Sequence, residues 1–260
     1  MIPKTIHYCW FGGNKKPKLF KKCYKSWKKH CPDYEIIEWN ESNFDISSCP
    51  LYVRQAYEAK KWAFVTDYVR LKIIYDNGGI YFDTDVELKK NIDFLLSYKA
   101  FFGLENRGDV INTGLGCGAE RGTKILYDML RDYEDIPFIN ADGSFDMTPC
   151  PERNTQIFLK YGLIQDDTKQ ILEENILVLP TRVLSPLNYE TGKMKITEDT
   201  VAIHWFESSW HTKEEKRKHK MKVFRVKLLK IVDFIIPDII LRKILGEYLF
   251  DILKMKTNKK

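Results

Sequence analysis

The sequence predicts a mixed α/β fold, in which one domain over residues 1–212 has a largely parallel sheet flanked by helices and a basic helical tail covers residues 213–260. Short apolar runs alternate with stretches of helical periodicity, and the first strand, helix and strand are spaced as in a parallel βαβ unit. The charge is also divided: the tail carries 15 Lys or Arg against 6 Asp or Glu, which leaves 27 against 30 in the rest. The net charge of +6 therefore arises in the tail, and the domain is mildly acidic.

The expected elements follow from local patterns along the chain. Strands are expected at short runs rich in β-branched and aromatic residues, namely Thr5–Trp10, Tyr34–Trp39, Ile80–Val86, Ala100–Leu104, Thr113–Gly118, Ile176–Leu179 and Val201–Trp205. Helices are expected where apolar residues recur with helical spacing, at about 18–30, 51–76, 121–133 and 153–161. Gly78 and Gly79 should end the second helix, because glycine adopts the left-handed conformation found at helix C-termini. Residues 134–151, rich in Asp, Pro and Gly, predict a long loop of the kind that usually serves function.

Cysteine usage and hydropathy favour a cytoplasmic protein. The six cysteines form no C-x-x-C pair, so free thiols are expected. No signal sequence opens the chain, and no stretch reaches the roughly 20 apolar residues that span a bilayer. Within residues 213–260, an apolar helical face lies opposite Lys and Arg. That face would be covered by the domain, by a partner or by the inner face of the cell membrane, to which the protein would then bind peripherally.

A lysine-rich helix near the N-terminus could suggest nucleic-acid binding. Its lysines alternate with Leu19, Phe20, Tyr24 and Trp27 at the spacing of an ordinary packed surface helix. Because the domain around it is acidic overall, we expect no nucleic-acid partner.

Four charged residues between Trp62 and Glu87 predict a functional site. Asp67 and Arg70 lie at positions i and i+3 on a helix face that also carries apolar residues. Asp83 and Asp85 would lie on one side of the following strand. Such carboxylates could hold a divalent cation that bridges a diphosphate, or Asp83 could be a phosphoryl-transfer nucleophile as in dehalogenase-type phosphohydrolases.

Several linked motifs resemble glycosyltransferase family 32, the Asp-x-Asp group that includes bacterial capsular polysaccharide transferases and is related to glycosylating toxin domains. The motifs occur in order along roughly the first half of the chain, at Ile2–Gly13, Ser26–Trp27, Pro32–Tyr34, Trp39–Glu41, Ala63–Leu71 and Gly78–Asp85. The resemblance implies a GT-A-like fold, a nucleotide-sugar donor, Mn²⁺ or Mg²⁺ as cofactor, and retention of configuration at the anomeric carbon. A UDP-sugar is the favoured donor, and a saccharide or lipid-linked saccharide is the expected acceptor.

The resemblance also implies roles for the residues that match its motifs. Asp85 would bind the metal, and Asp83 would contact the metal's waters and the donor. Asp67 and Arg70 would bind sugar hydroxyls. His204 is the expected third metal ligand, with Glu207 as its rival.

The resemblance implies further contacts with the donor. Tyr8 and Trp10 would line the pocket for the base, and Thr84 lies between the two aspartates. Ser208 and Trp210 would contact the phosphates and cover the donor, and Asn112 is a candidate near the reacting carbon.

The sequence thus predicts a metal-dependent, retaining hexosyltransferase that acts in capsule or surface polysaccharide synthesis. Two alternatives stay open: a dehalogenase-type phosphohydrolase with Asp83 as nucleophile, and a non-catalytic protein that binds sugar nucleotides.

Overall fold

A computed structural model describes residues 1–207, 214, 217–218, 221 and 223. The chain divides into two compact units, one formed by residues 1–187 and 194–210 and the other by residues 188–193 and 211–260. The first unit is a mixed α/β fold, as predicted. Apart from residues 214, 217–218, 221 and 223, the predicted tail lies outside the described residues. Among the described residues, no helix is both long and apolar enough to cross a bilayer.

Residues 1–207 contain ten strands and six α-helices, together with short 3-10 turns and loops. The strands are β1 (Thr5–Cys9), β2 (Glu35–Trp39), β3 (Gly79–Tyr81), β4 (Val86–Leu88), β5 (Ala100–Glu105), β6 (Val110–Asn112), β7 (Cys117–Ala119), β8 (Gln170–Leu172), β9 (Ile176–Leu179) and β10 (Ala202–His204). The α-helices are α1 (Lys18–His30), α2 (Leu51–Glu58), α3 (Trp62–Asn77), α4 (Lys124–Arg131), α5 (Cys150–Lys160) and α6 (Thr181–Leu184). All six cysteines are free and buried, as predicted for reduced thiols.

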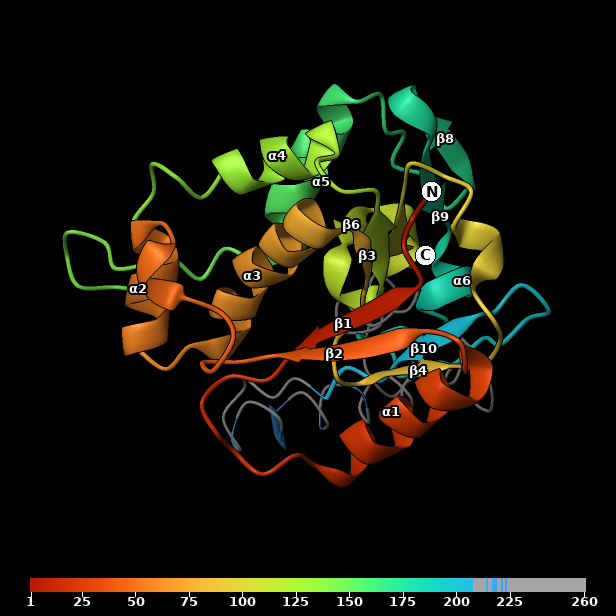
Figure 1. The fold of residues 1–260 in the computed structure, drawn as a ribbon, viewed down its shortest axis with the longest axis horizontal. Coiled ribbons are helices and arrows are strands. Elements are labelled where there is room, and N and C mark those ends of the chain that lie inside the picture. Colours follow the sequence, from red (N-terminus) through yellow and green to blue (C-terminus); the bar gives the residue numbers. More distant parts are fainter. Residues whose placement is uncertain (208–213, 215–216, 219–220, 222, 224–260) are drawn as a thin grey trace, which may run out of the picture. The chain divides into compact units, whose positions relative to one another are not determined.

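The main sheet has the strand order β2-β1-β3-β7-β5-β9-β8, with β6 paired to β5. Figure 1 labels β1, β2, β3, β6, β8 and β9 of this sheet. β2, β1 and β3 are parallel neighbours, β7 is antiparallel to both β3 and β5, and β9 is parallel to β5. Five strands of this sheet therefore run in one direction, and β1, β3 and β5 end at the same edge. β4 and β10 form a separate antiparallel pair.

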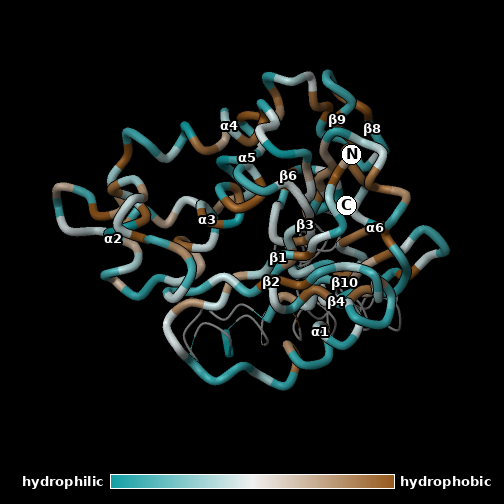
Figure 2. The backbone as a smooth tube through the Cα atoms, in the orientation of Figure 1, coloured by the Kyte–Doolittle hydropathy of each residue, from teal (hydrophilic) through white to brown (hydrophobic). Residues whose placement is uncertain are grey.

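Two hydrophobic cores cover the two faces of the main sheet. Helices α2 to α5 pack on one face, where the rings of Phe102 and Phe158 lie 4.7 Å apart. Helices α1 and α6 and the β4–β10 pair cover the other face, where Trp27 packs on Phe82. Figure 2 shows hydrophobic segments concentrated around the central strands and hydrophilic residues along many of the connecting loops.

The predicted elements differ from the structure in several places. The single helix expected over residues 51–76 is two helices, because the chain breaks at Lys60, whose φ is 56°. The strand expected at Thr113–Gly118 is a 3-10 turn, Thr113–Leu115, followed by β7. The three-residue strands β6 and β8 were not predicted, because such short strands carry too few residues to show an alternating pattern.

The two glycines after α3 allow the chain to pass close to His7. A Cβ atom on Gly79 would lie 2.8 Å from His7 Nε2, and both Gly78 and Gly79 have positive φ. His7 Nε2 donates to the Gly78 carbonyl at 3.0 Å, and His7 Nδ1 accepts from the Trp39 indole N–H at 3.0 Å. The buried imidazole is therefore neutral, with its proton on Nε2. Burial lowers the pKa of His7 to about 4.

The folded protein should lose stability in acid through His7. Its pKa falls from 6.5 to about 4 on folding, so the stabilisation is complete above pH 6.5 and is lost as the pH falls toward 4, by about 3 kcal/mol. Urea unfolding across this range should show a shallower pH dependence in His7→Gln than in the wild type. His30→Gln, at a less buried histidine, is the control, and equal slopes in wild type and His7→Gln would contradict the expectation.

Candidate functional site

Asp83 and Asp85 lie in a turn between β3 and β4. The Val86 N–H donates to the Asp83 carbonyl at 3.0 Å, and Thr84 occupies the turn between the two aspartates. The prediction of one continuous strand over Ile80–Val86 is therefore wrong: the chain leaves the main sheet after β3, and β4 pairs with β10 instead.

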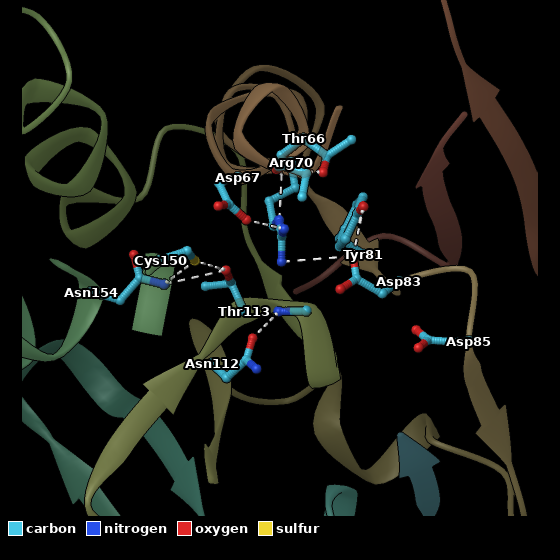
Figure 3. Close-up of polar contacts among 12 residues, drawn as sticks. Thr66, Asp67, Arg70, Tyr81, Asp83, Asp85, Asn112, Thr113, Cys150 and Asn154 are labelled. Atoms are coloured by element: carbon cyan, nitrogen blue, oxygen red, sulfur yellow. Dashed lines mark hydrogen bonds and ion pairs between the residues drawn. The ribbon is translucent and has the colours of Figure 1, made fainter. Parts of the chain in front are cut away.

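Asp67, Arg70 and Asp83 form one charged cluster (Figure 3). The Arg70 guanidinium bonds the Asp67 carboxylate, and Arg70 Nε donates to the Thr66 carbonyl at 3.0 Å. Arg70 Nη1 lies 3.6 Å from Asp83 Oδ1, and the Tyr81 hydroxyl donates to the same oxygen at 3.0 Å. The pair predicted on α3 thus faces the Asp-x-Asp turn.

Burial shifts the ionisation of this cluster. It raises the pKa of Asp67 to about 6; the Arg70 charge opposes this shift, and the Asp83 charge adds to it. Burial alone would lower the pKa of Arg70, but Asp83 and Asp67 hold it well above its ordinary value. Arg70 therefore stays charged between two carboxyl groups.

Asp85 and His204 meet beside this cluster. His204 Nε2 lies 3.1 Å from Asp85 Oδ1, and the Glu207 backbone N–H donates to Asp85 Oδ2 at 2.7 Å. One ligand atom each from Asp83, Asp85 and His204 lies within 4.8 Å of the other two. Opposed ligands of one cation lie about 4 to 5 Å apart, since each metal–ligand distance is about 2.0 to 2.6 Å.

These three donors fit a divalent cation. Carboxylate oxygens suit Mg²⁺ and Mn²⁺, whereas an imidazole nitrogen suits transition metals better than Mg²⁺, so the set favours Mn²⁺. Burial alone would lower the pKa of His204, but Asp85 raises it to about 9. A cation that binds here must therefore displace the proton that Asp85 and His204 share at neutral pH.

Asn112, the last residue of β6, supports the Asp-x-Asp turn. Its Oδ1 accepts from the Gly114 N–H at 2.7 Å, and its Nδ2 donates to Glu105. The Gly114 carbonyl accepts from the Asp83 N–H at 3.2 Å. A Cβ atom on Gly114 would lie 2.2 Å from Asp83 Oδ2 and 2.8 Å from Arg70 Nη1, so only glycine fits against the charged cluster.

A cavity of about 430 Å³ lies next to Trp10, just after β1. Its other lining residues come mainly from the lysine-rich segment before and within α1 and from the end of β2, and they include Lys15, Lys16, Lys21, Glu38 and Asn40. Tyr8 does not line it: only 5% of Tyr8 is exposed, its ring packs on Phe20 and Trp27, and its hydroxyl donates to Glu38 at 2.5 Å. Of the two predicted base-pocket aromatics, the structure therefore places only Trp10 at a cavity.

Some site residues were not predicted, and two predicted ones lie outside the described residues. The two predicted residues outside the described part of the chain are Ser208 and Trp210. Tyr81 was missed, although its position two residues before Asp83 could have indicated it. Glu105 and Cys150 were also missed. Glu105 bonds Asn112, and the Cys150 thiol contacts Thr113 and Asp67; no local pattern reveals these tertiary contacts.

Comparisons with known proteins agree with this site. Residues 17–102, which include Asp67, Arg70, Asp83 and Asp85, match the family described as "Glycosyltransferase sugar-binding region containing DXD motif". The match confirms the resemblance predicted from the sequence, and it supports a transferase.

Two curated proteins are similar in sequence. Inositol phosphoceramide mannosyltransferase 3 of Schizosaccharomyces pombe is 30% identical over 141 residues, which are 53% of this chain and 38% of the yeast protein. The chain thus matches less than half the length of that relative. Uncharacterized glycosyltransferase L373 of Acanthamoeba polyphaga mimivirus is 25% identical over 222 residues, which are 81% of this chain and 84% of the viral protein.

Two solved structures are also similar. One is the PaToxG glycosyltransferase, with a TM-score of 0.46 and 18% identity over 61% of this chain and 69% of that one. The other is a glycosyltransferase involved in glycosylation of the major capsid of PBCV-1, with a TM-score of 0.44 and 14% identity over 83% of this chain and 98% of that one.

Proposed function

We propose that this protein is a cation-dependent glycosyltransferase that moves a sugar from a nucleotide-sugar donor to an acceptor hydroxyl. A UDP-sugar is our favoured donor, a saccharide or lipid-linked saccharide is the acceptor, and configuration is retained. The observation that carries the proposal is the convergence of Asp83, Asp85 and His204 next to the Asp67–Arg70 pair. Four of these five residues lie inside the matched sugar-binding region.

The Asp67–Arg70 pair on α3 would bind and orient the sugar. The Asp67 carboxylate can accept hydrogen bonds from sugar hydroxyls, and Arg70 Nη1 can donate one, because its 3.6 Å separation from Asp83 exceeds hydrogen-bond length. A sugar held by both groups would present its anomeric carbon in a fixed orientation, which lowers the barrier to transfer.

The rest of the donor would extend along the edge where β1 and β3 end. Asp83, Asp85 and His204 would hold Mn²⁺, which when bound would offset negative charge developing on the departing diphosphate. Trp10 would stack on the base, and Lys15 and Lys16 in the same cavity would attract the phosphates.

A thermal-shift panel of UDP, UDP-glucose, UDP-galactose, UDP-N-acetylglucosamine and GDP-mannose, each with and without Mn²⁺, tests the proposal. At saturation, the correct donor with Mn²⁺ should raise Tm by about 5 °C or more, because it binds only the folded state. The protein should also hydrolyse that donor slowly. In a separate test, NMR assigns the anomeric configuration of the sugar after transfer, which shows whether the configuration of the donor is retained.

The outcomes separate the parts of the proposal. A flat response to every nucleotide sugar would contradict the transferase assignment. A response restricted to GDP-mannose would contradict the choice of base but not the class. Phosphate release from an aryl phosphate that disappears in Asp83→Ala would favour the phosphohydrolase instead.

A further inference from the structure

Glu105 is an acidic residue at the same edge of the sheet as the Asp-x-Asp turn. It is the last residue of β5, which runs in the same direction as β3, and its side chain is half-buried. One of its carboxylate oxygens, Oε2, accepts from Asn112 Nδ2.

A chain of contacts leads from Glu105 to the charged cluster. Asn112 bonds Glu105 with its amide nitrogen and the Gly114 N–H with its carbonyl oxygen. The Gly114 carbonyl in turn accepts from the Asp83 N–H. The α-carbon of Gly114 packs so tightly against Asp83 and Arg70 that no Cβ atom fits there. A shift of this turn would therefore move Asp83 relative to Arg70.

The chemistry of a carboxylate suits this position. A carboxylate can only accept hydrogen bonds, whereas a carboxamide can present either its oxygen or its nitrogen. Glu105 therefore forces Nδ2 of Asn112 toward itself and leaves Oδ1 for Gly114. Without that acceptor, the Gly114 N–H is the only one of these two contacts left to orient the Asn112 carboxamide, so the side chain is held less firmly.

We propose that Glu105 is a positioning residue of the sugar-transfer site, which acts through Asn112 and Gly114 to set the separation of Asp83 and Arg70. Its effect on catalysis rests on the proposed function; its effect on the Asn112 carboxamide does not. Glu105 need not touch the donor or the acceptor for this role.

Two substitutions at Glu105 separate a hydrogen-bond role from a role of its charge. Glu105→Met is nearly isosteric and removes the acceptor, so kcat for donor hydrolysis should fall about tenfold or more. The Kd for UDP with Mn²⁺ should change less than kcat, because Asp85 and His204 would still hold the cation and only Asp83 is displaced. Glu105→Gln keeps an acceptor oxygen and should restore kcat to within about threefold of wild type. Glu198→Met, an exposed glutamate, is the control.

A double-mutant cycle tests whether Glu105 acts through Asn112. The Glu105→Met/Asn112→Ala double variant should be no slower than Asn112→Ala alone, because the contact is already absent. Additive losses, or a Glu105→Gln variant as slow as Glu105→Met, would overturn the proposal.

A second readout does not depend on activity. In protein labelled with ¹⁵N-asparagine, the Asn112 side-chain NH₂ signals are identified by their loss in Asn112→Ala. They should move or broaden in Glu105→Met and stay near the wild-type position in Glu105→Gln. Unchanged signals in Glu105→Met would refute the positioning role even if the wild type proved to be no transferase. An inactive wild type with the expected signal changes would refute only the proposed function.

Discussion

Asp85→Asn is expected to lower kcat/KM for Mn²⁺-dependent donor hydrolysis about 100- to 1,000-fold, because metal stabilisation of transition-state charge contributes several kcal/mol. Asparagine can still accept the Glu207 N–H that now bonds Asp85 Oδ2. It cannot supply the charge that attracts a cation. Without that charge, the pKa of His204 should also fall, since Asp85 is the main group that raises it. Isothermal titration with Mn²⁺ alone should show weaker binding in parallel with the lost activity.

The control for this variant is Asp33→Asn, which removes a surface carboxylate that pairs with Lys4 and is 53% exposed at its side chain. It should keep both Mn²⁺ affinity and activity. The Tm of Asp85→Asn without metal should fall at neutral pH, because the variant loses its buried pair with His204, so binding and activity are compared at a temperature where both proteins are folded. Undiminished Mn²⁺-dependent hydrolysis in Asp85→Asn would show that the cation site lies elsewhere.

The parts of the site that the sequence predicted well depend on local geometry. Asp67 and Arg70 are one helical turn apart, so their pairing follows from the i, i+3 spacing alone. The stop at Gly78 and Gly79 is also local, since the left-handed conformation it needs is a property of glycine. For both features the structure agrees with the prediction.

The path of the chain after β3 could not be read from the sequence. Ile80 to Val86 has the composition of a strand, but β4 finds its partner in β10, more than 100 residues later. That pairing turns the chain at Asp83 and brings His204 to Asp85. The choice between a continuous strand and a turn is made by this distant strand, and no local pattern records it.

For a related reason, the structure places only one of the two predicted aromatic residues, Trp10, at a cavity. Tyr8 and Trp10 alternate correctly for one side of a strand, but the strand ends at Cys9. Tyr8 is therefore held in the core by α1, whereas Trp10 lies beyond the strand and borders a cavity. The alternation of side chains along a strand predicts which face of the sheet each residue is on. Where the strand ends and which element covers that face are known only from the structure.

Arg70→Gln should lower the free energy of unfolding by about 3 to 5 kcal/mol at pH 8, because it leaves two carboxylates together without their buried cation. Only 4% of Arg70 is exposed, and its guanidinium lies between Asp67 and Asp83. Urea unfolding measures the loss. Arg182→Gln is the control: its pair with Asp199 is largely exposed, so the loss there should be about 1 kcal/mol or less.

The loss in Arg70→Gln should also depend on pH. The pKa of Asp67 is raised on folding from 3.8 to about 6, so the folded state binds a proton more tightly than the unfolded chain and gains stability as the pH falls from above 6 toward 4. Arg70 opposes this rise, so without it the gain should begin at higher pH. The difference between Arg70→Gln and wild type should therefore be smaller at pH 5.5 than at pH 8. Adding Asp67→Asn should recover part of the loss at pH 8, because one of the two facing charges is then gone. An equal loss at both pH values would mean that packing of the guanidinium, and not its charge, accounts for the stability.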